Sequence, residues 1–252
     1  MTISFDRIAS AYDHVRAHPS EVAQRIGASL AEICGADVLE LGVGTGRIAL
    51  PLARAGCRVT GVDVSDGMLR VAQAANEPQL ALLRGDIARL PLASASFDAI
   101  VVVHVLHLLK DWRSALVDGR RALRPGGRFI QGRDWRDPQS CVGQLREQLR
   151  SAVMELLPNA RPPGAGASIG AVLGELGFAL EPERSLVSWV TPISPAEVLA
   201  EMASRADAET WSLEQPILDA AMARLTSWAL AQYGDLDVTQ DVERRFVVVV
   251  AR

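Results

Sequence analysis

Apolar residues in the first half of the chain follow two alternating patterns. Short runs rich in β-branched residues, such as Phe97–Val103, are typical of strands buried on both faces of a sheet. Between them lie amphipathic segments with helical spacing, bounded by capping residues or by Gly and Pro. Strands and helices that alternate in this way indicate βαβ units and a mostly parallel sheet. The predicted strands lie at 36–41, 58–62, 80–84 and 97–103, with a fifth beginning at 128, and the predicted helices at 6–15, 19–34, 45–55, 65–75 and 112–123.

The pattern changes after Asp134. Helical segments dominate this part of the chain, and a Pro- and Gly-rich stretch follows the first of them. The apolar run Arg245–Ala251 predicts a last strand near the end of the sequence. We predict one domain over residues 1–252, in which segments 136–167 and 192–240 add a helical cap over the ligand-binding edge of the sheet.

Composition narrows the class of protein. With 252 residues, 49% apolar residues and 22% charged residues, the chain is long and apolar enough for one well-buried domain. The net charge of −4 and the absence of a basic block argue against a nucleic-acid partner. The sequence shows no signal peptide, and its longest apolar run, Ala99–Leu109, is too short to span a membrane. We therefore expect a cytoplasmic protein with no membrane insertion.

The three cysteines, Cys34, Cys57 and Cys141, are far apart and form no CxxC pair. Neither a disulfide framework nor a zinc site is predicted from this spacing. We predict no metal site.

The most informative stretch is a glycine-rich turn, Gly42-x-Gly44-x-Gly46, directly after the first predicted strand. Such a turn brings bare backbone close to a ligand. Its spacing differs from the GxGxxG dinucleotide fingerprint, because the third glycine comes one residue early. Asp63 lies 21 residues after Gly42, at the end of the next strand, where an acid would reach the ribose hydroxyls of a nucleoside. These residues alone do not separate a dinucleotide from adenosylmethionine.

Weaker signals follow the next two predicted strands. Asp86, after the third strand, is placed to accept a hydrogen bond from an exocyclic amine such as that of adenine. Met68, one helical turn after Asp63, is placed either to pack on an adenine face or to lie in the core.

Taken in order, these segments resemble the motif set of class I S-adenosylmethionine-dependent methyltransferases. The N-terminal segment Phe5–Asp13 is similar to that of the small-molecule branch that includes quinone-biosynthesis C-methyltransferases. The resemblance covers residues 5–135 well and is specific for the cofactor, but not for the acceptor. The segments that carry it are VLELGVGTG (38–46), VDVS (62–65), GDI (85–87), FDAI (97–100) and LRPGG (123–127).

The resemblance implies an α/β, Rossmann-like fold with a seven-stranded, mostly parallel sheet, in which an antiparallel last strand lies next to the fifth. It implies S-adenosyl-L-methionine as cofactor and S-adenosyl-L-homocysteine as product. Gly42, Gly44 and the loop around them would meet the methionine half, and the helix from Thr45 would face its carboxylate. The remaining implied contacts are Glu40 near the ammonium, Asp63 on the ribose, Met68 and Ile87 beside the adenine, Asp86 on its amine, Val103 and His104 beneath the sulfonium, and Tyr12 closing over the cofactor.

The implied reaction is an in-line displacement on an activated methyl group. The protein mainly has to align a nucleophile and exclude water. A general base is needed only if the acceptor must lose a proton, and His104 and His107 are the candidates by position. Arg133, Asp134 and Trp135 face the same edge of the predicted sheet and could bind a polar acceptor group.

Several alternatives stay open. Residues Val103–Leu106 stand where amino-methylating members of the family carry an Asn-Pro-Pro-Tyr tetrad, which argues against DNA or release-factor methylation. The apolar composition and the family branch that the chain resembles favour a small, partly apolar organic acceptor, with O-, N- and C-methylation all open. A non-catalytic S-adenosylmethionine-binding protein and an NAD(P)-dependent oxidoreductase remain as alternatives. The sequence leaves both monomer and homodimer open.

Overall fold

The computed structural model describes residues 17–157, 168–205, 210 and 213–252. The helix predicted at 6–15 lies outside the described residues. The chain divides into two compact units. The sheet unit comprises Met1–Arg133, Pro163–Val187 and Phe246–Arg252, and the helical unit comprises Asp134–Pro162 and Ser188–Arg245.

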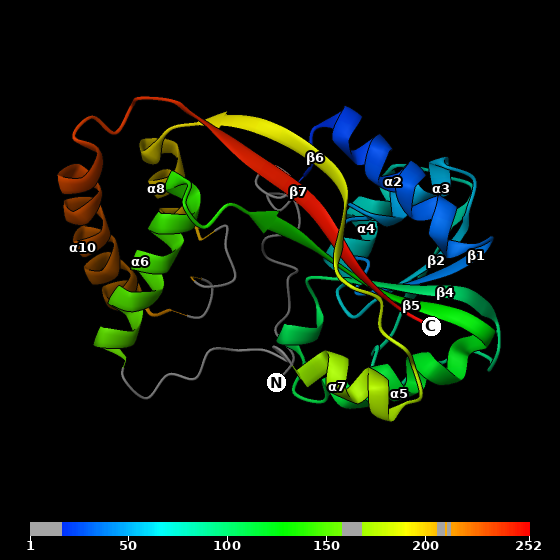
Figure 1. Cartoon of the computed structure of the whole chain (residues 1–252). Helices are drawn as coiled ribbons and strands as arrows, with labels where there is room; N and C mark the ends of the chain where they lie inside the picture. The colour runs from blue at the N-terminus through cyan, green and yellow to red at the C-terminus, as the bar shows by residue number, and fades with distance from the viewer. Residues whose placement is uncertain (1–16, 158–167, 206–209, 211–212) are drawn as a thin grey trace. The chain divides into compact units, whose positions relative to one another are not determined.

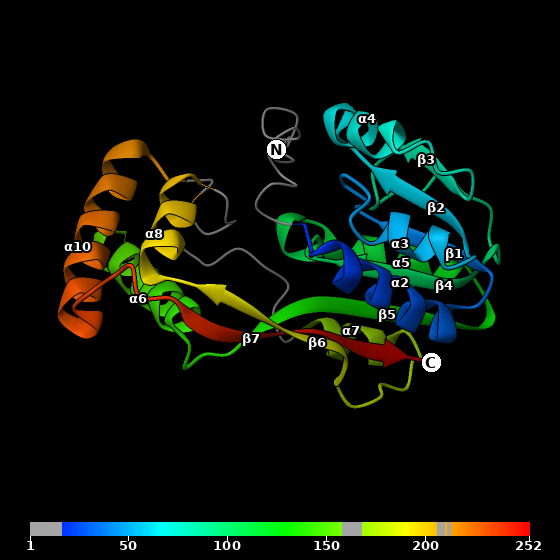
Figure 2. The same ribbon diagram turned by 90° about the horizontal axis from the view of Figure 1, so that it is seen from above.

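A seven-stranded sheet has the strand order β3-β2-β1-β4-β5-β7-β6 (Figure 2). Strands β1 to β5 pair in parallel, and the final strands are antiparallel, which confirms the predicted Rossmann-like α/β class. The last strand, β7, lies next to β5 as expected. The strands are β1 (Asp37–Leu41), β2 (Arg58–Asp63), β3 (Leu80–Arg84), β4 (Phe97–Val103), β5 (Leu123–Arg136), β6 (Arg184–Ile193) and β7 (Gln240–Ala251).

Helices cover both faces of the sheet in this unit (Figure 1). Leu39 and Leu41 of β1 belong to the apolar cluster that includes the buried residues of the helices α5 and α7. Because side chains alternate along a strand, Glu40 lies on the opposite face, toward α2 and α3. The helices of the sheet unit are α2 (Ser20–Cys34), α3 (Ala49–Arg54), α4 (Asp66–Ala74), the 3-10 turn η1 (Leu106–Leu108), α5 (Trp112–Ala122) and α7 (Ser168–Glu175).

The prediction of a helix over 45–55 was wrong at its start. The helix α3 begins only at Ala49 and has six residues. Gly42, Gly44 and Gly46 all have positive φ angles, of 71°, 53° and 86°, which keep the preceding turn out of the helical conformation. Pro51 then falls within the first turn of α3, where a missing amide hydrogen is tolerated.

The fifth strand begins earlier than predicted. Leu123 already pairs with Phe97, and Ala99 pairs next with Arg128, so residues 124–127 form an irregularity within β5. The turn residues of this segment therefore interrupt the strand and do not precede it.

An ion-pair cluster holds this irregularity against β1. Arg124 Nη1 donates to Asp98 Oδ1 at 2.6 Å and to Asp37 Oδ2 at 2.9 Å. Asp98 Oδ2 also accepts from the backbone amides of Ala36 and Asp37, at 3.1 and 2.9 Å. The amide of Asp37 and the Arg124 guanidinium together hold the pKa of Asp98 below its ordinary value of 3.8.

Removing this carboxylate is expected to destabilise the fold. Asp98→Ala leaves two backbone amides and Arg124 without their acceptor, which should lower the free energy of unfolding by about 2 kcal/mol. Because the folded-state pKa lies below 3.8, this stabilisation is present above that pH and is lost as the pH falls through the folded value. Urea unfolding at pH 7 and pH 3 measures it. If Asp98→Ala lowered the free energy of unfolding by the same amount at pH 7 and at pH 3, the stabilising role assigned to the Asp98 carboxylate would be wrong.

The helical unit has its own apolar core. The core includes Leu145 and Leu149 of α6, Met202 of α8, Leu225 of α10 and Val242 of β7. Tyr233 Oη donates to Gln144 Oε1 at 2.8 Å and joins α10 to α6. The helices of this unit are α6 (Cys141–Leu156), α8 (Pro195–Ala203) and α10 (Gln215–Tyr233).

No helix among the described residues is long and apolar enough to cross a membrane. Within the same residues, no group of three or more His, Cys, Asp or Glu side chains is placed to hold a metal ion.

Candidate functional site

The glycine turn lies at the carboxyl end of β1 and is fastened to β2. The amides of Gly42 and Val43 donate to the carbonyl oxygen of Val62 at 2.8 and 3.0 Å. Ligands of open α/β sheets bind outside the carboxyl ends of the strands, close to such a turn. The turn is therefore the natural starting point for the site.

The three glycines have different surroundings. A Cβ atom at Gly42 would lie 2.5 Å from Cγ2 of Val105, and one at Gly46 would lie 2.9 Å from Cγ of Leu50. At Gly44 no heavy atom of the described residues, apart from those of Gly44 and its two chain neighbours, lies within 4 Å of the same position. Gly42 and Gly46 thus allow close packing within the protein, whereas Gly44 presents open backbone on which a ligand can lie.

Asp63 joins this turn to the next helix. Its Oδ2 atom accepts from the Gly44 amide and its Oδ1 atom from the Ser65 amide, both at 2.9 Å. The structure therefore brings Gly44 and Asp63 together, although they are 19 residues apart. A half-buried carboxylate beside open backbone is a suitable acceptor for vicinal hydroxyl groups.

Thr45 is buried within the turn, four residues before α3 begins. The prediction that a helix beginning at Thr45 faces the methionine carboxylate is therefore not supported.

Met68 and Ile87 are both buried, with 3% and 5% of their surface exposed. Met68 lies in the first turn of α4, which Ser65 caps by accepting from the Met68 amide at 3.2 Å. Ile87 belongs to the same apolar cluster as Val62. Both lie close in sequence to strand ends at the edge of the sheet that carries Asp63.

Asp86 follows β3 and is exposed. Its Oδ1 atom accepts from the Ala88 amide at 2.9 Å, so one carboxylate oxygen organises the local turn. The predicted contact with an adenine amine stays a prediction.

The two histidines predicted as candidate bases, His104 and His107, follow the end of β4. Val103, the last residue of β4, is buried, and His104 follows it with a φ angle of 52°. A left-handed histidine costs conformational energy, and such residues cluster at functional sites. The packing of Val105 against Gly42 places the segment after β4 beside the glycine turn. His107 lies within η1 and, like His104, is half-buried.

Glu40 is the most unusual group of the site. It is 3% exposed, and its Oε2 atom has no hydrogen-bond partner among the described residues. Burial raises the pKa of its carboxyl to about 8, against the opposing effects of the Arg47 guanidinium and the Ala49 amide. An unpartnered buried oxygen of this kind suggests that a ligand completes the site.

Two residues of this neighbourhood were missed in the sequence. Arg47 Nη1 lies 3.0 Å from Nε2 of His18, 29 residues earlier. Arg47 directly follows Gly46, and that adjacency was the only available signal for it. Since a guanidinium can only donate, Nε2 of His18 is the acceptor in this contact.

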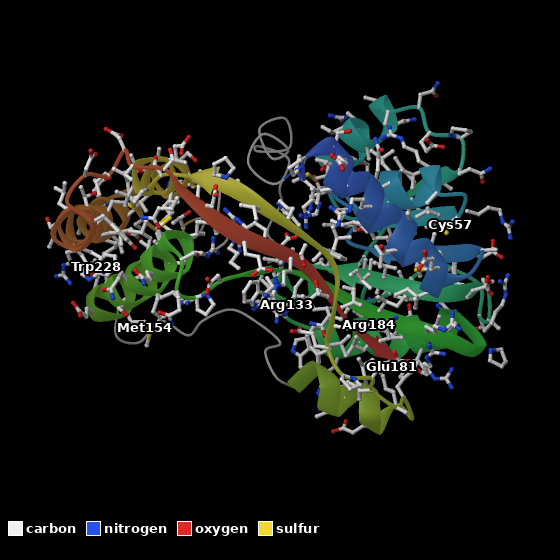
Figure 3. All side chains as sticks on the ribbon, turned by 45° about the horizontal axis from the view of Figure 1, so that its top comes forward. Cys57, Arg133, Met154, Glu181, Arg184 and Trp228 are labelled. Carbon is white, nitrogen blue, oxygen red and sulfur yellow. The ribbon has the colours of Figure 1, made fainter. Side chains whose placement is uncertain are left out.

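Of the remaining predicted residues, Arg133 lies within the described part of the chain. Arg133 of β5 donates from Nε and Nη2 to the carboxylate of Glu183 at 2.9 and 2.7 Å and is labelled in Figure 3. Its charge is thus already neutralised within the sheet unit. Tyr12 lies outside the described residues.

Comparison with known proteins identifies the family. A family model described as a methyltransferase domain matches residues 39–131. An O-methyltransferase of Aspergillus nomiae, named rstn1, is 33% identical over 172 residues, which are 66% of this chain and 74% of that protein. This chain belongs to the class I S-adenosylmethionine-dependent methyltransferases. The cofactor of this methyltransferase is S-adenosyl-L-methionine.

Quinone-biosynthesis enzymes are among the relatives of this methyltransferase. Demethylmenaquinone methyltransferase of Streptomyces avermitilis is 36% identical over 135 residues, which are 50% of this chain. The match spans only 56% of that relative. The solved structure of the YcgJ protein from Bacillus subtilis shares the fold, with a TM-score of 0.57, 17% identity, and coverage of 90% of this chain and 97% of that one.

Proposed function

We propose that this methyltransferase transfers the methyl group of S-adenosyl-L-methionine to a small organic acceptor by in-line displacement. The observation that carries the proposal is the pairing of Gly44 with Asp63. It joins open backbone and a half-buried carboxylate at the edge of the sheet where this fold binds ligands. The orphaned Oε2 atom of Glu40 also fits a cofactor that ends in an ammonium group.

We assign the cofactor contacts as follows. Asp63 holds the ribose hydroxyls, and the backbone of Gly42, Gly44 and Thr45 borders the methionine half. Glu40 lies near the ammonium. Met68 and Ile87 flank the adenine, Asp86 accepts from its amine, and Tyr12 covers the cofactor. Val103 and His104 lie nearest to the reacting methyl.

The bound cofactor supplies an activated methyl group, so the protein needs no strong nucleophile of its own. The rigid turn and the Asp63 hydrogen bonds orient the donor, and buried side chains such as Val103 exclude water. His104 can remove a proton from the acceptor where the chemistry requires it, with His107 as the second candidate.

The nature of the acceptor is part of the proposal. The names of the two curated relatives refer to demethylmenaquinone and to oxygen methylation. We propose a partly apolar aromatic acceptor and leave open which atom is methylated. Mass spectrometry after incubation with the cofactor and a panel of quinols and phenols tests this. A gain of one methyl group on a panel member supports the proposal, whereas cofactor binding with no transfer to any tested acceptor would favour a non-catalytic binding protein.

We also propose that segments 136–167 and 192–240 are helical additions to a single methyltransferase domain. The protein is proposed to act in the cytoplasm on a small molecule, without nucleic acid and without membrane insertion. The net charge of −4 supports the absence of a nucleic-acid partner. Monomer and homodimer are both compatible with this proposal.

His104→Asn tests the proposed base. Asparagine tolerates the left-handed backbone of this position but cannot take up a proton near neutral pH. We expect kcat to fall by about 10²- to 10⁴-fold, with affinity for S-adenosylhomocysteine nearly unchanged. His107→Asn is the matched control and should lower kcat far less. An unchanged kcat in His104→Asn would remove His104 from the mechanism.

A further inference from the structure

Glu40 is buried, and its burial affects the protonation of its carboxyl as well as its contacts. Glu40 lies on the face of β1 that carries α2 and α3, one residue before the end of the strand. Each oxygen of Asp63 accepts from one backbone amide and keeps a lone pair for a further donor, whereas Oε2 of Glu40 has no hydrogen-bond partner among the described residues. Of the two acids beside the glycine turn, Glu40 is thus the one left incomplete.

The charged groups around Glu40 have opposing effects on the pKa of its carboxyl. Arg47 and the Ala49 amide favour the carboxylate, whereas burial and the nearby Asp63 favour the neutral acid. Cys34 of α2 is a further titratable neighbour, and its own pKa is raised to about 12, chiefly by burial. Arg47 is also shared with His18. Within the described part of the chain, burial outweighs the attraction, and the pKa of Glu40 rises to about 8.

A cation bound beside Glu40 would lower the pKa of its carboxyl and so favour the ionised form. An opposite charge within about 4–6 Å lowers a carboxyl pKa by roughly 1 to 3. Applied to Glu40, this brings the acid from mostly neutral to at least about half ionised at pH 7. The ammonium of the cofactor is the cation that the proposed function places here.

We propose that Glu40 is a neutral acid in the free protein and gives up its proton when the cofactor ammonium binds, so that cofactor binding is coupled to proton release. This inference rests on the proposed function for the location of the ammonium. It makes Glu40 a proton-linked binding residue and makes cofactor affinity depend on pH near neutrality. Affinity rises with pH because the free protein holds a proton that the complex does not.

Calorimetric titration with S-adenosylhomocysteine tests the coupling. At pH 7, the apparent enthalpy should differ between phosphate and Tris buffers by an amount that corresponds to release of about 0.4 to 0.9 proton per molecule bound. The dissociation constant should be about 5- to 50-fold lower at pH 8 than at pH 6, the range that follows from the expected pKa change. Binding with the same enthalpy in both buffers would overturn the proposal.

Two control titrations test whether the released proton comes from Glu40 and whether its release depends on the cofactor ammonium. Glu40→Gln keeps the side-chain shape but has no proton to release, so it should show neither the buffer effect nor the pH dependence. A thermal melt shows whether it folds. Wild type titrated with 5′-methylthioadenosine, which lacks the amino-acid end, should bind without releasing a proton. Proton release with this probe would contradict the assignment to the ammonium. If S-adenosylhomocysteine did not bind at any pH, the proposed function would fail, whereas binding without proton release would overturn this inference alone.

Discussion

Replacing Gly44 with alanine is expected to weaken cofactor binding at least tenfold while the protein stays folded. Beyond the two chain neighbours of Gly44, the added methyl group meets no atom of the described residues within 4 Å, so it would project into the space that the cofactor is proposed to occupy. The φ angle of 53° costs a side chain about 1–2 kcal/mol of folding free energy, which most domains survive. Calorimetry with S-adenosylhomocysteine and urea unfolding measure the two effects separately.

Two further glycine variants serve as controls. Gly56→Ala is also strained by a positive φ angle, of 102°, and its added methyl group meets no atom of the described residues within 4 Å beyond its chain neighbours, but Gly56 lies outside the proposed site. It should lose stability and keep its affinity. Gly42→Ala should be destabilised by roughly 3 kcal/mol, because overpacking against Val105 adds to the backbone strain. Equal affinities in Gly44→Ala and Gly56→Ala would show that the open side of Gly44 does not face the cofactor.

Replacing Asp63 with alanine is expected to weaken cofactor binding by about 1–3 kcal/mol, or roughly 5- to 150-fold. The change removes the proposed acceptor for the ribose hydroxyls. It also frees the Gly44 and Ser65 amides, so the turn loses the group that fastens it to the start of α4. Both effects lower affinity, and the second also lowers stability.

A matched variant separates the two contributions. Asp111→Ala removes the N-cap of α5, whose side chain accepts from the Ser114 amide, at a cost of about 1 kcal/mol. It should therefore lose similar stability with no change in affinity. If Asp63→Ala bound S-adenosylhomocysteine as tightly as wild type, with an intact fold, the ribose assignment would be wrong.

Much of the sheet could be predicted because its strands have strong local signals. The bounds of β3 and β4 were predicted correctly, since Gly85 and Asp86 follow the apolar run of β3 and His104 follows the β-branched run of β4. The start of α3 was not, because the residues after Gly46 have ordinary helix propensity and only the backbone angles show where the turn ends. The start of β5 was missed because pairing with β4 overrides the turn preference of residues 124–127.

The candidate site, like the fold, could be predicted only in part from the sequence. Glycine spacing and strand ends were enough to predict that the glycine turn and Asp63 lie together. The contact of Arg47 with His18 depends on the fold, because 29 residues separate them. The burial of Glu40 could not be predicted either. Strand alternation gives the face on which a side chain lies, but not whether helices exclude water from that face.

The central claim is that the glycine turn and Asp63 bind the S-adenosyl group. The most direct test is calorimetric titration of the full chain with S-adenosylhomocysteine and, in parallel, with NADH. We predict saturable binding of S-adenosylhomocysteine with one site per chain and no binding of NADH at the same concentrations. Saturable binding of NADH without binding of S-adenosylhomocysteine would contradict the account.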